Sequence, residues 1–523
     1  MTRRAEDALF GLAMLAACAV AALLLRREIA SRRSEETIVI ESGRVPRAPA
    51  ASVEDAGRSE ESEDDEADAE ESPVLAEAAR LKREGCLAEA VEVLESALAR
   101  GGESPSVLAE LGTALIAAGR YEEAASALER ALSSDPSNAR WSYNLGVALS
   151  SAGDKAGAVA AYQSALDLRP SYFRARYNLG LTLAKLGQLD AAEKAFRAIV
   201  QTEGSENAAR AYFQLGYVLA RRRKTEEAIA AYRQAALLKP DYVEARNNLA
   251  LLLERGDSES AIAELEKAAR VQPRSASVHF NLGRLYASRG RLEEAAAAYA
   301  RAAEIEPKLA KASYNLGATL ERLGRSAEAI AAYERAAAAD PANPRALLRL
   351  GSILRDSGRP GAAEQAFRRA LRADPRAAEA WNGLGILYAR RGDAERALEA
   401  YSQAVALDPE SVAARNNMAL ALERLGRTAR AIEACRAVLD REPSHLSARR
   451  QLARLYARSD DSKRALEEAA KLERLAPGDA ECLAVAARIY LQFERYADAA
   501  PVLARLAALR AKGGTSAEEA TAP

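Results

Sequence analysis

RAAEAWNGLGILYARRGDAERALEAYSQAVALDP, residues 376–409, is the stretch that decides the fold. Its first half places an aromatic residue, a Leu-Gly pair and a tyrosine on one helix face. A turn follows around Gly392, and the second half places an alanine and an aromatic residue at helical spacing before a proline. The residues in these slots are Trp381, Leu384, Gly385, Tyr388, Ala397, Tyr401 and Pro409. The stretch therefore predicts a helix, a tight turn and a second helix that ends at the proline.

The same spacing recurs from about residue 72 to residue 510. Successive prolines lie 34 residues apart at Pro273, Pro307, Pro341, Pro375, Pro409, Pro443 and Pro477. The slot of Ala397 holds alanine in every unit, at Ala90, Ala124, Ala158, Ala192, Ala228, Ala261, Ala295, Ala329, Ala363, Ala397, Ala431, Ala465 and Ala499. The slot of Gly385 holds glycine or alanine throughout. We expect these small residues, on facing helices, to let the backbones approach closely while Leu384 and Tyr401 fill the surrounding space.

This pattern resembles the tetratricopeptide repeat, a unit of about 34 residues with the same series of signature residues. Tyr401 is the one departure, because phenylalanine is commoner in that slot. The resemblance implies an all-α fold, namely an α-solenoid wound as a right-handed superhelix of about 12–13 repeats. It also implies that the first helix of each repeat lines a concave face, where partners are expected to bind.

Outside the repeats, the composition predicts three further segments. The expected organisation is a membrane anchor at 1–33, a disordered acidic linker at 34–71, the repeat array at 72–510 and a disordered tail at 511–523. The array should count as one long domain, because a solenoid is a single quasi-one-dimensional stack. The linker is expected to be disordered because residues 54–71 hold 11 acidic residues, one arginine and almost nothing apolar.

Residues 8–25 form an unbroken run of 18 apolar residues with arginines on both sides. As a helix this run would span about 27 Å, just enough to cross a bilayer. Two arginines precede it and four follow it closely, so the positive-inside tendency places the array on the cytoplasmic side. We therefore expect a single-pass amino-terminal anchor with a cytoplasmic array.

A second interpretation of the same run stays open. Leu15, Ala16, Ala17 and Cys18 match the site at which bacterial lipoproteins are cleaved and acylated, which would leave Cys18 as the first residue. The apolar run continues past Cys18 to Leu25, however, and this continuation favours an uncleaved anchor. The Ala- and Arg-rich composition favours a bacterial source in either case.

Candidate partner-binding residues recur on the expected concave face. The slot two residues before Gly385 holds an amide side chain in most units, at Asn144, Asn178, Gln214, Asn248, Asn281, Asn315, Asn417 and Gln451. The row resembles the asparagine ladder of the arrays in O-linked GlcNAc transferase and kinesin light chain, which holds extended peptide backbones. An amide offers both a donor and an acceptor to a peptide unit, whatever the ligand's sequence. The alternative is that these amides bond within the repeats.

Basic residues also recur on the first helices and predict a preference for acidic partner segments. Arg345 and Arg349 are four residues apart on one helix face, and with Asn315 they resemble part of the carboxylate clamp with which other proteins of this family grip chaperone tails. Phe280 and Arg284 stand where that clamp has lysine and asparagine, which argues against chaperone binding.

Nothing in the sequence predicts catalysis. The two histidines lie in ordinary repeat helices, and no metal-ligand cluster, phosphate loop or nucleophile motif is present. We expect no cofactor, no metal and no small-molecule substrate. The basic turn at 221–224 lacks a recognition fold beside it, so nucleic-acid binding is not expected.

The predicted function is a membrane-tethered scaffold that binds partner proteins or extended peptides. Two alternatives stay open. One is an exported lipoprotein or periplasmic assembly factor, and the other is a substrate-recognition arm for a separately encoded transferase.

Overall fold

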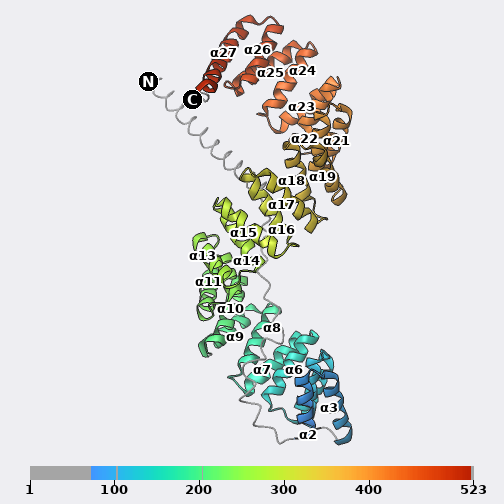
Figure 1. The fold of residues 1–523 in the computed structure, drawn as a ribbon, viewed down its shortest axis with the longest axis vertical. Coiled ribbons are helices and arrows are strands. Elements are labelled where there is room, and N and C mark those ends of the chain that lie inside the picture. The colour runs from blue at the N-terminus through green and yellow to red at the C-terminus, as the bar shows by residue number, and fades with distance from the viewer. Residues whose placement is uncertain (1–71, 102–103, 203, 520–523) are drawn as a thin grey trace, which may run out of the picture. The chain divides into compact units, whose positions relative to one another are not determined.

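The computed structural model describes residues 72–101, 104–202 and 204–519, and these residues form helices without a strand among them (Figure 1). The expected anchor at 8–25 and the acidic linker lie outside the described residues. Within them, no helix combines the length and the apolar character that crossing a bilayer requires.

The described chain divides into two compact units. The first unit ends at Leu285 and the second begins at Tyr286. Such a division is possible because each repeat of a solenoid contacts only its neighbours, so no core is shared by the whole stack. Each unit is described by itself below.

The helices up to the division are α2 (Pro73–Glu84), α3 (Leu87–Gly101), α4 (Pro105–Ala117), α5 (Tyr121–Ser134), α6 (Ala139–Ala152), α7 (Lys155–Leu168), α8 (Phe173–Lys185), α9 (Leu189–Thr202), α10 (Ser205–Arg221), α11 (Thr225–Leu238), α12 (Val243–Leu253), α13 (Ser258–Val271) and α14 (Ala276–Ser288). The remaining helices are α15 (Leu292–Ile305), α16 (Ala310–Arg322), α17 (Ser326–Ala339), α18 (Pro344–Asp356), α19 (Pro360–Ala373), α20 (Ala378–Arg390), α21 (Ala394–Leu407), α22 (Val412–Arg424), α23 (Thr428–Arg441), α24 (Leu446–Arg458), α25 (Ser462–Leu475), α26 (Ala480–Gln492) and α27 (Tyr496–Glu519). Even-numbered helices are the first helices of the repeats, and odd-numbered helices are the second helices.

The predicted hairpin is confirmed by α20 and α21. Leu384 and Tyr401 are each 3% exposed, and Ala397 is fully buried. Every alanine in the slot of Ala397 is at most 1% exposed. The turn at Gly392 has a φ of +84°, which favours glycine, and Asp393 N donates to Tyr388 O at 3.0 Å.

The glycine slot works differently from our expectation. A methyl group built at Gly385 would lie 2.5 Å from a ring carbon of Tyr401, and one at Gly351 would lie 2.6 Å from the ring of Phe367. The glycine therefore makes room for an aromatic ring of the second helix, rather than for a second small residue. The ring lies where a Cβ atom would be, so the close contact is between a backbone and a side chain.

The carboxyl-terminal boundary also differs from the expected one. We placed the end of the array at Arg510, but α27 continues to Glu519.

Candidate functional site

The amide row lies on the face made by the first helices, which we call the first-helix face. In the first unit, Asn178 Nδ2 donates to Tyr143 Oη at 3.2 Å, and Gln214 Nε2 donates to Tyr177 Oη at 3.3 Å. Each bond links a first helix to the first helix of the preceding repeat. The amide hydrogens of these two side chains are thus partly used inside the array.

The next two amides of the first unit also bond within the array, Asn248 to the preceding second helix α11 and Asn281 to the preceding first helix α12. Asn248 Nδ2 lies 3.4 Å from Tyr232 Oη, and Asn281 Nδ2 donates to Asn247 Oδ1 at 2.7 Å. Gln214 and Asn248 are 5% exposed, whereas Asn144, Asn178 and Asn281 are half-buried. A ligand would therefore meet mainly the side chains of the half-buried members.

The hydroxyl of Tyr143 has a hydrogen that the bond with Asn178 does not use. Tyr143 accepts the hydrogen bond from Asn178, and burial raises the pKa of Tyr143 to about 12. The phenol is therefore neutral at physiological pH and retains its own O–H as a donor. Phenol hydrogens and amide oxygens on one face match the acceptors and donors of an extended backbone.

The amides of the second unit are more deeply placed. Asn315 is 6% exposed and Gln451 is fully buried. Asn417 Nδ2 donates to Asn382 Oδ1 at 3.1 Å, and Gln451 Nε2 donates to Glu423 at 3.0 Å. Among the described residues, the buried Gln451 Oε1 is one of the few side-chain atoms without a hydrogen-bond partner.

Arg345 and Arg349 do not form an open pair for a carboxylate. Arg349 contacts Glu321 Oε2 through Nη2 at 2.8 Å and through Nε at 3.3 Å. Tyr333 also donates to that carboxylate oxygen. Arg345 remains exposed, but its neighbour on the helix is already paired with an acidic side chain of the preceding repeat.

Several arginines near the ends of the first helices have a structural role. Arg221 Nη1 donates to Ala184 O at 2.9 Å, and Arg424 Nη1 donates to Ala389 O at 3.0 Å. Each guanidinium satisfies a carbonyl at the carboxyl end of the preceding first helix, where helix carbonyls lack an internal partner. Their spacing in sequence therefore reflects repeat stacking as well as surface charge.

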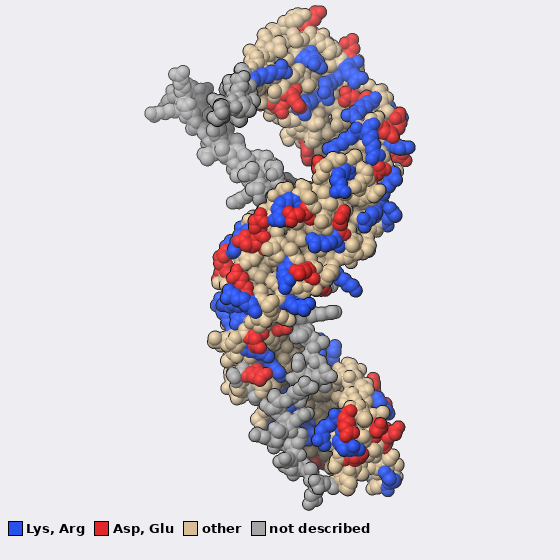
Figure 2. Space-filling view, in the orientation of Figure 1, with Lys and Arg blue, Asp and Glu red and all other residues tan. Residues whose placement is uncertain are grey.

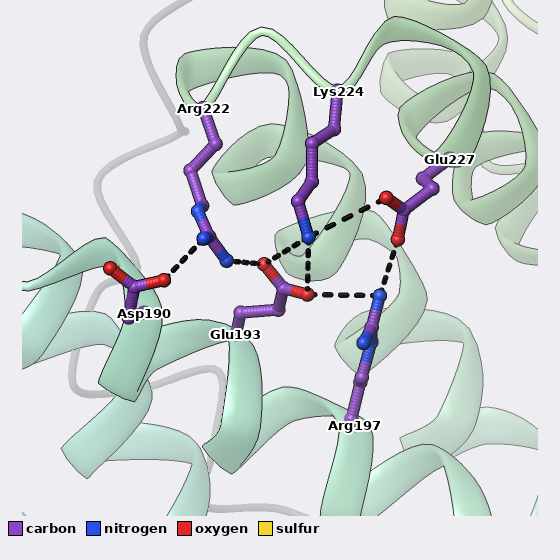
Figure 3. Close-up of polar contacts among 6 residues, drawn as sticks. All are labelled: Asp190, Glu193, Arg197, Arg222, Lys224 and Glu227. Carbon is purple, nitrogen blue, oxygen red and sulfur yellow. Dashed lines mark hydrogen bonds and ion pairs between the residues drawn. The ribbon is translucent and has the colours of Figure 1, made fainter.

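Two of the four basic residues of the turn at 221–224, Arg222 and Lys224, form ion pairs with acidic side chains within the array (Figure 3). Glu193 on α9 is 4% exposed and lies 3.2 Å from Lys224 Nζ and 2.9 Å from Arg197 Nη2. Arg222 pairs with Glu193 as well. The six side chains of this cluster are the acidic Asp190, Glu193 and Glu227 and the basic Arg197, Arg222 and Lys224, so their formal charges cancel. The cluster joins two repeats and offers no net charge to nucleic acid.

Two arginines that the sequence analysis did not single out are exposed on the first-helix face of the second unit. Arg454 on α24 and Arg488 on α26 occupy the same slot of consecutive repeats, and among the described residues neither forms an ion pair. The contacts on either side of them are the ion pair between Arg450 and Glu481 and the 2.9 Å bond from Gln492 Nε2 to Ala457 O. These contacts hold α24 against α26, which carry Arg454 and Arg488 at equivalent positions.

The arginine pair is a local feature rather than part of a large basic field. On the face that Figure 2 shows, basic and acidic side chains are interspersed over both units. The sequence signal that marks the pair is the spacing Arg450, Arg454, Arg458, which places three arginines on one face of α24.

The two histidines and Cys435 have structural roles within the repeats. A ring nitrogen of His279 lies 3.0 Å from Pro273 O, in the same slot where Arg415 Nη2 donates to Pro409 O at 2.7 Å. His445 Nδ1 accepts from Ala448 N at 3.1 Å and caps α24. Burial raises the pKa of Cys435 to about 12, which keeps that thiol protonated. In the described ranges no group of three or more potential metal ligands comes together.

Two family models, both described as tetratricopeptide repeat, match the chain. The first matches residues 75–139, 109–173, 143–209, 177–243, 213–255, 250–310, 306–344, 314–375, 348–412 and 388–445, and the second matches residues 422–489. Comparison with curated proteins gives no match.

Solved structures of repeat proteins resemble parts of the chain. MamA from Desulfovibrio magneticus RS-1, residues 41 to its end, is 26% identical, with 33% of this chain and 97% of that chain covered and a TM-score of 0.31. YrrB, described as having an unusual peptide-binding site, is 24% identical over 36% of this chain and 96% of its own, with a TM-score of 0.33. Yeast Tom70 is 17% identical over 83% and 98%, with a TM-score of 0.34. None of these likenesses bears on what this chain binds.

Proposed function

Because the chain belongs to the tetratricopeptide repeat family, we propose that it is a non-catalytic, membrane-tethered scaffold that binds extended segments of partner proteins on its first-helix face. The observation that carries this proposal is the recurrence of hydrogen-bonding side chains on that face. Half-buried amides such as Asn178 recur along the first helices, and Tyr143 beside Asn178 has a hydroxyl hydrogen that their bond does not use.

The spacing of these groups suits an extended chain. Packed helices lie about 8–10 Å apart, and an extended peptide rises about 3.3 Å per residue. Each repeat would then meet roughly every third residue of a bound segment. One such hydrogen bond contributes only about 1 kcal/mol net, so binding requires several consecutive repeats.

A preference for acidic segments is supported by Arg454 and Arg488. Their neighbours Arg450 and Arg458 are paired with Glu481 and Glu423, but these two guanidinium groups are exposed and without an ion pair in the described residues. Exposed guanidinium groups can form charge-assisted hydrogen bonds with a carboxylate, and these are among the strongest polar contacts.

Peptide binding by the full chain tests this preference. Fluorescence anisotropy would compare a labelled peptide of alternating Glu and Ser with one of alternating Gln and Ser. We expect the Glu peptide to bind more tightly, and Arg454→Gln with Arg488→Gln to weaken it about tenfold or more, as expected for lost charge-assisted bonds. The matched control is Arg369→Gln with Arg436→Gln, which removes two exposed arginines from second helices. Equal binding of both peptides would contradict the acidic preference.

The membrane tether rests on the apolar run at 8–25 and its flanking arginines. We propose that this run anchors the chain and that the array faces the cytoplasm. Protease protection in sealed vesicles of known orientation, followed by mass determination of the amino terminus, tests both points. An intact Met1 with a cytoplasm-facing array supports the anchor. A chain that begins at acylated Cys18 and faces outward would instead identify a lipoprotein of the envelope.

A further inference from the structure

The second helix of the last described repeat, α27, has an outer face that is exposed to solvent. The corresponding face of every earlier second helix is buried by the following repeat. The slot of Tyr401 is between 0% and 3% exposed in all earlier repeats, because the residue there packs against its own first helix and against the following repeat. In α27 the same slot holds Leu503, which is 40% exposed. The helix lies at the carboxyl-terminal end of the second unit (Figure 1).

Leu503 belongs to an exposed apolar stripe. Tyr496, Ala500, Leu503 and Ala507 are all exposed, with Tyr496 at 63%, and they follow the spacing i, i+4, i+7, i+11. This spacing places them on one side of the helix. The exposed residues beside the stripe, Ala497, Ala504 and Ala508, are also apolar.

Two arginines next to the stripe lie away from it and form ion pairs. Arg495 pairs with Asp498 at 2.6 Å, and Arg505 pairs with Glu473 of α25. Between Tyr496 and Ala507 the stripe therefore contains no charged side chain, and the exposed Arg510 follows it on the same side of the helix. A terminal repeat ordinarily has a polar outer face, which keeps a solenoid soluble.

The first helix of the first unit has such a polar face. On α2, Arg80 pairs with Glu77 at 2.6 Å and with Glu84 at 3.2 Å, and all three side chains are at least 43% exposed. Stacking the α27 stripe of one copy on α2 of another would bury these charges against apolar groups at a large cost. A head-to-tail assembly of copies is thereby disfavoured.

The order of side chains along the stripe points to a symmetric contact. Large and small residues alternate as Tyr496, Ala500, Leu503, Ala507. Two antiparallel copies of α27 would place Tyr496 opposite Ala507 of the second copy and Ala500 opposite Leu503 of the second copy. Every large residue then faces a small one, as close packing of two helices requires.

We propose that two copies of this chain associate through the α27 stripe in an antiparallel, two-fold symmetric contact. Such an isologous interface uses the same patch on both copies and closes on itself, so it yields dimers rather than filaments. The stripe spans about 17 Å of helix, at about 1.5 Å per residue. We expect a contact of this length to bury less than the roughly 1,000 Å² typical of stable complexes, so the dimer should dissociate in the micromolar range.

Sedimentation velocity of the purified full chain over about a hundred-fold range of concentration around 10 µM tests the proposal. We expect a reversible monomer–dimer equilibrium, and Leu503→Glu should raise the dissociation constant at least tenfold. Tyr496→Glu, at a more exposed position, should act in the same direction. Leu237→Glu is the matched control, because Leu237 is 70% exposed in the first unit.

The antiparallel register has its own test. The Leu503→Glu and Ala500→Lys variants should each be monomeric when studied alone. A mixture of the two variants should form heterodimers, because Glu at 503 then faces Lys at 500 of the other copy. A wild-type chain that is monomeric at every concentration would overturn the proposal. An association that both the Leu503 and Tyr496 variants retain would place it on another surface and also overturn it.

Discussion

Glu193 and Lys224 are 31 residues apart in sequence, yet Lys224 Nζ lies 3.2 Å from a carboxylate oxygen whose side chain is only 5% exposed (Figure 3). The contact joins α9 to the turn that begins α11, so it ties one repeat to the next. Neighbour-to-neighbour contacts of this kind hold a solenoid together.

Glu193→Gln is expected to loosen this junction, because it removes the one buried charge that Arg197, Arg222 and Lys224 share. These cations are 24–44% exposed and can be rehydrated, so we expect a loss of about 1–3 kcal/mol in local stability at neutral pH. Hydrogen exchange of the backbone amides in α9–α11 measures this loss of local stability. Glu123→Gln, which breaks an exposed pair with Arg120, is the control and should leave its own segment unchanged. Unaltered exchange in Glu193→Gln would contradict the assigned role.

The same junction should depend on pH. Burial by itself would raise the pKa of Glu193, but Lys224, Arg197 and Arg222 together hold that pKa below its ordinary value. A carboxyl group whose pKa is lower in the folded than in the unfolded state stabilises the fold at pH values above its unfolded pKa, about 4.3. This contribution is lost as the pH falls through the folded pKa. The stability difference between wild type and Glu193→Gln should therefore stay constant at neutral pH and shrink in acid. A difference that persisted at the lowest pH where the array stays folded would count against this account.

The helices and turns followed directly from the sequence, because Ala397 and Gly392 recur at a fixed period and each has a local physical reason. The hydrogen-bond and ion-pair partners of the polar side chains could not be predicted from the sequence. Whether Asn178 meets Tyr143 or a ligand depends on the rotation between successive repeats, which a constant period leaves undetermined. The pairing of Arg349 with Glu321 was missed for the same reason.

One long-range contact was available in the sequence and went unnoticed. Glycine and an aromatic ring occur together 16 residues apart in the pairs Gly146–Tyr162, Gly180–Phe196, Gly216–Tyr232, Gly283–Tyr299, Gly317–Tyr333, Gly351–Phe367 and Gly385–Tyr401. Units with alanine in the first slot have a smaller or aliphatic residue in the second, as in Ala78–Leu94 and Ala419–Cys435. Gly112 is an exception, because it faces Leu128 and a methyl group built there would lie 2.5 Å from that side chain, so glycine in this slot is not confined to units with a ring.

Glu494→Gly should stabilise the last repeat. Glu494 has a φ of +56° in the turn slot that Gly392 fills elsewhere. The left-handed conformation costs a non-glycine residue about 1–2 kcal/mol, and glycine avoids this cost. Fixing the more flexible glycine backbone on folding offsets about 0.5–1 kcal/mol of the gain. We expect a net gain of about 0.5–1 kcal/mol in thermal unfolding. Glu494→Ala keeps the strain and should bring no gain, so equal effects of the two variants would refute the explanation.

Glu321→Gln should make Arg349 available to ligands. The carboxylate of Glu321 accepts two bonds from Arg349, at 2.8 and 3.3 Å, and so competes with any carboxylate of a partner. If acidic segments bind along this part of the first-helix face, the variant should bind the Glu-Ser peptide about three- to tenfold more tightly. Glu328→Gln removes an acidic residue from a second helix and is the control. An unchanged affinity would show that Arg349 is purely structural.

Gly385→Ala should destabilise its repeat through a clash that a second substitution can relieve. The added methyl group would lie 2.5 Å from the ring of Tyr401. Overpacking of this kind costs about 1–3 kcal/mol, and the better helix propensity of alanine offsets about 1 kcal/mol of it.

Tyr401→Leu should relieve the clash, because Ala78 already accommodates Leu94 in the same two slots. A double-mutant cycle, measured by hydrogen exchange in α20 and α21, should therefore show a favourable coupling energy of about 1 kcal/mol or more. Gly361→Ala is the matched control, since a methyl group built at Gly361 meets nothing within 4 Å. If Gly385→Ala were as well tolerated as Gly361→Ala, or if the two substitutions were additive, the ring would not be what excludes a side chain at residue 385.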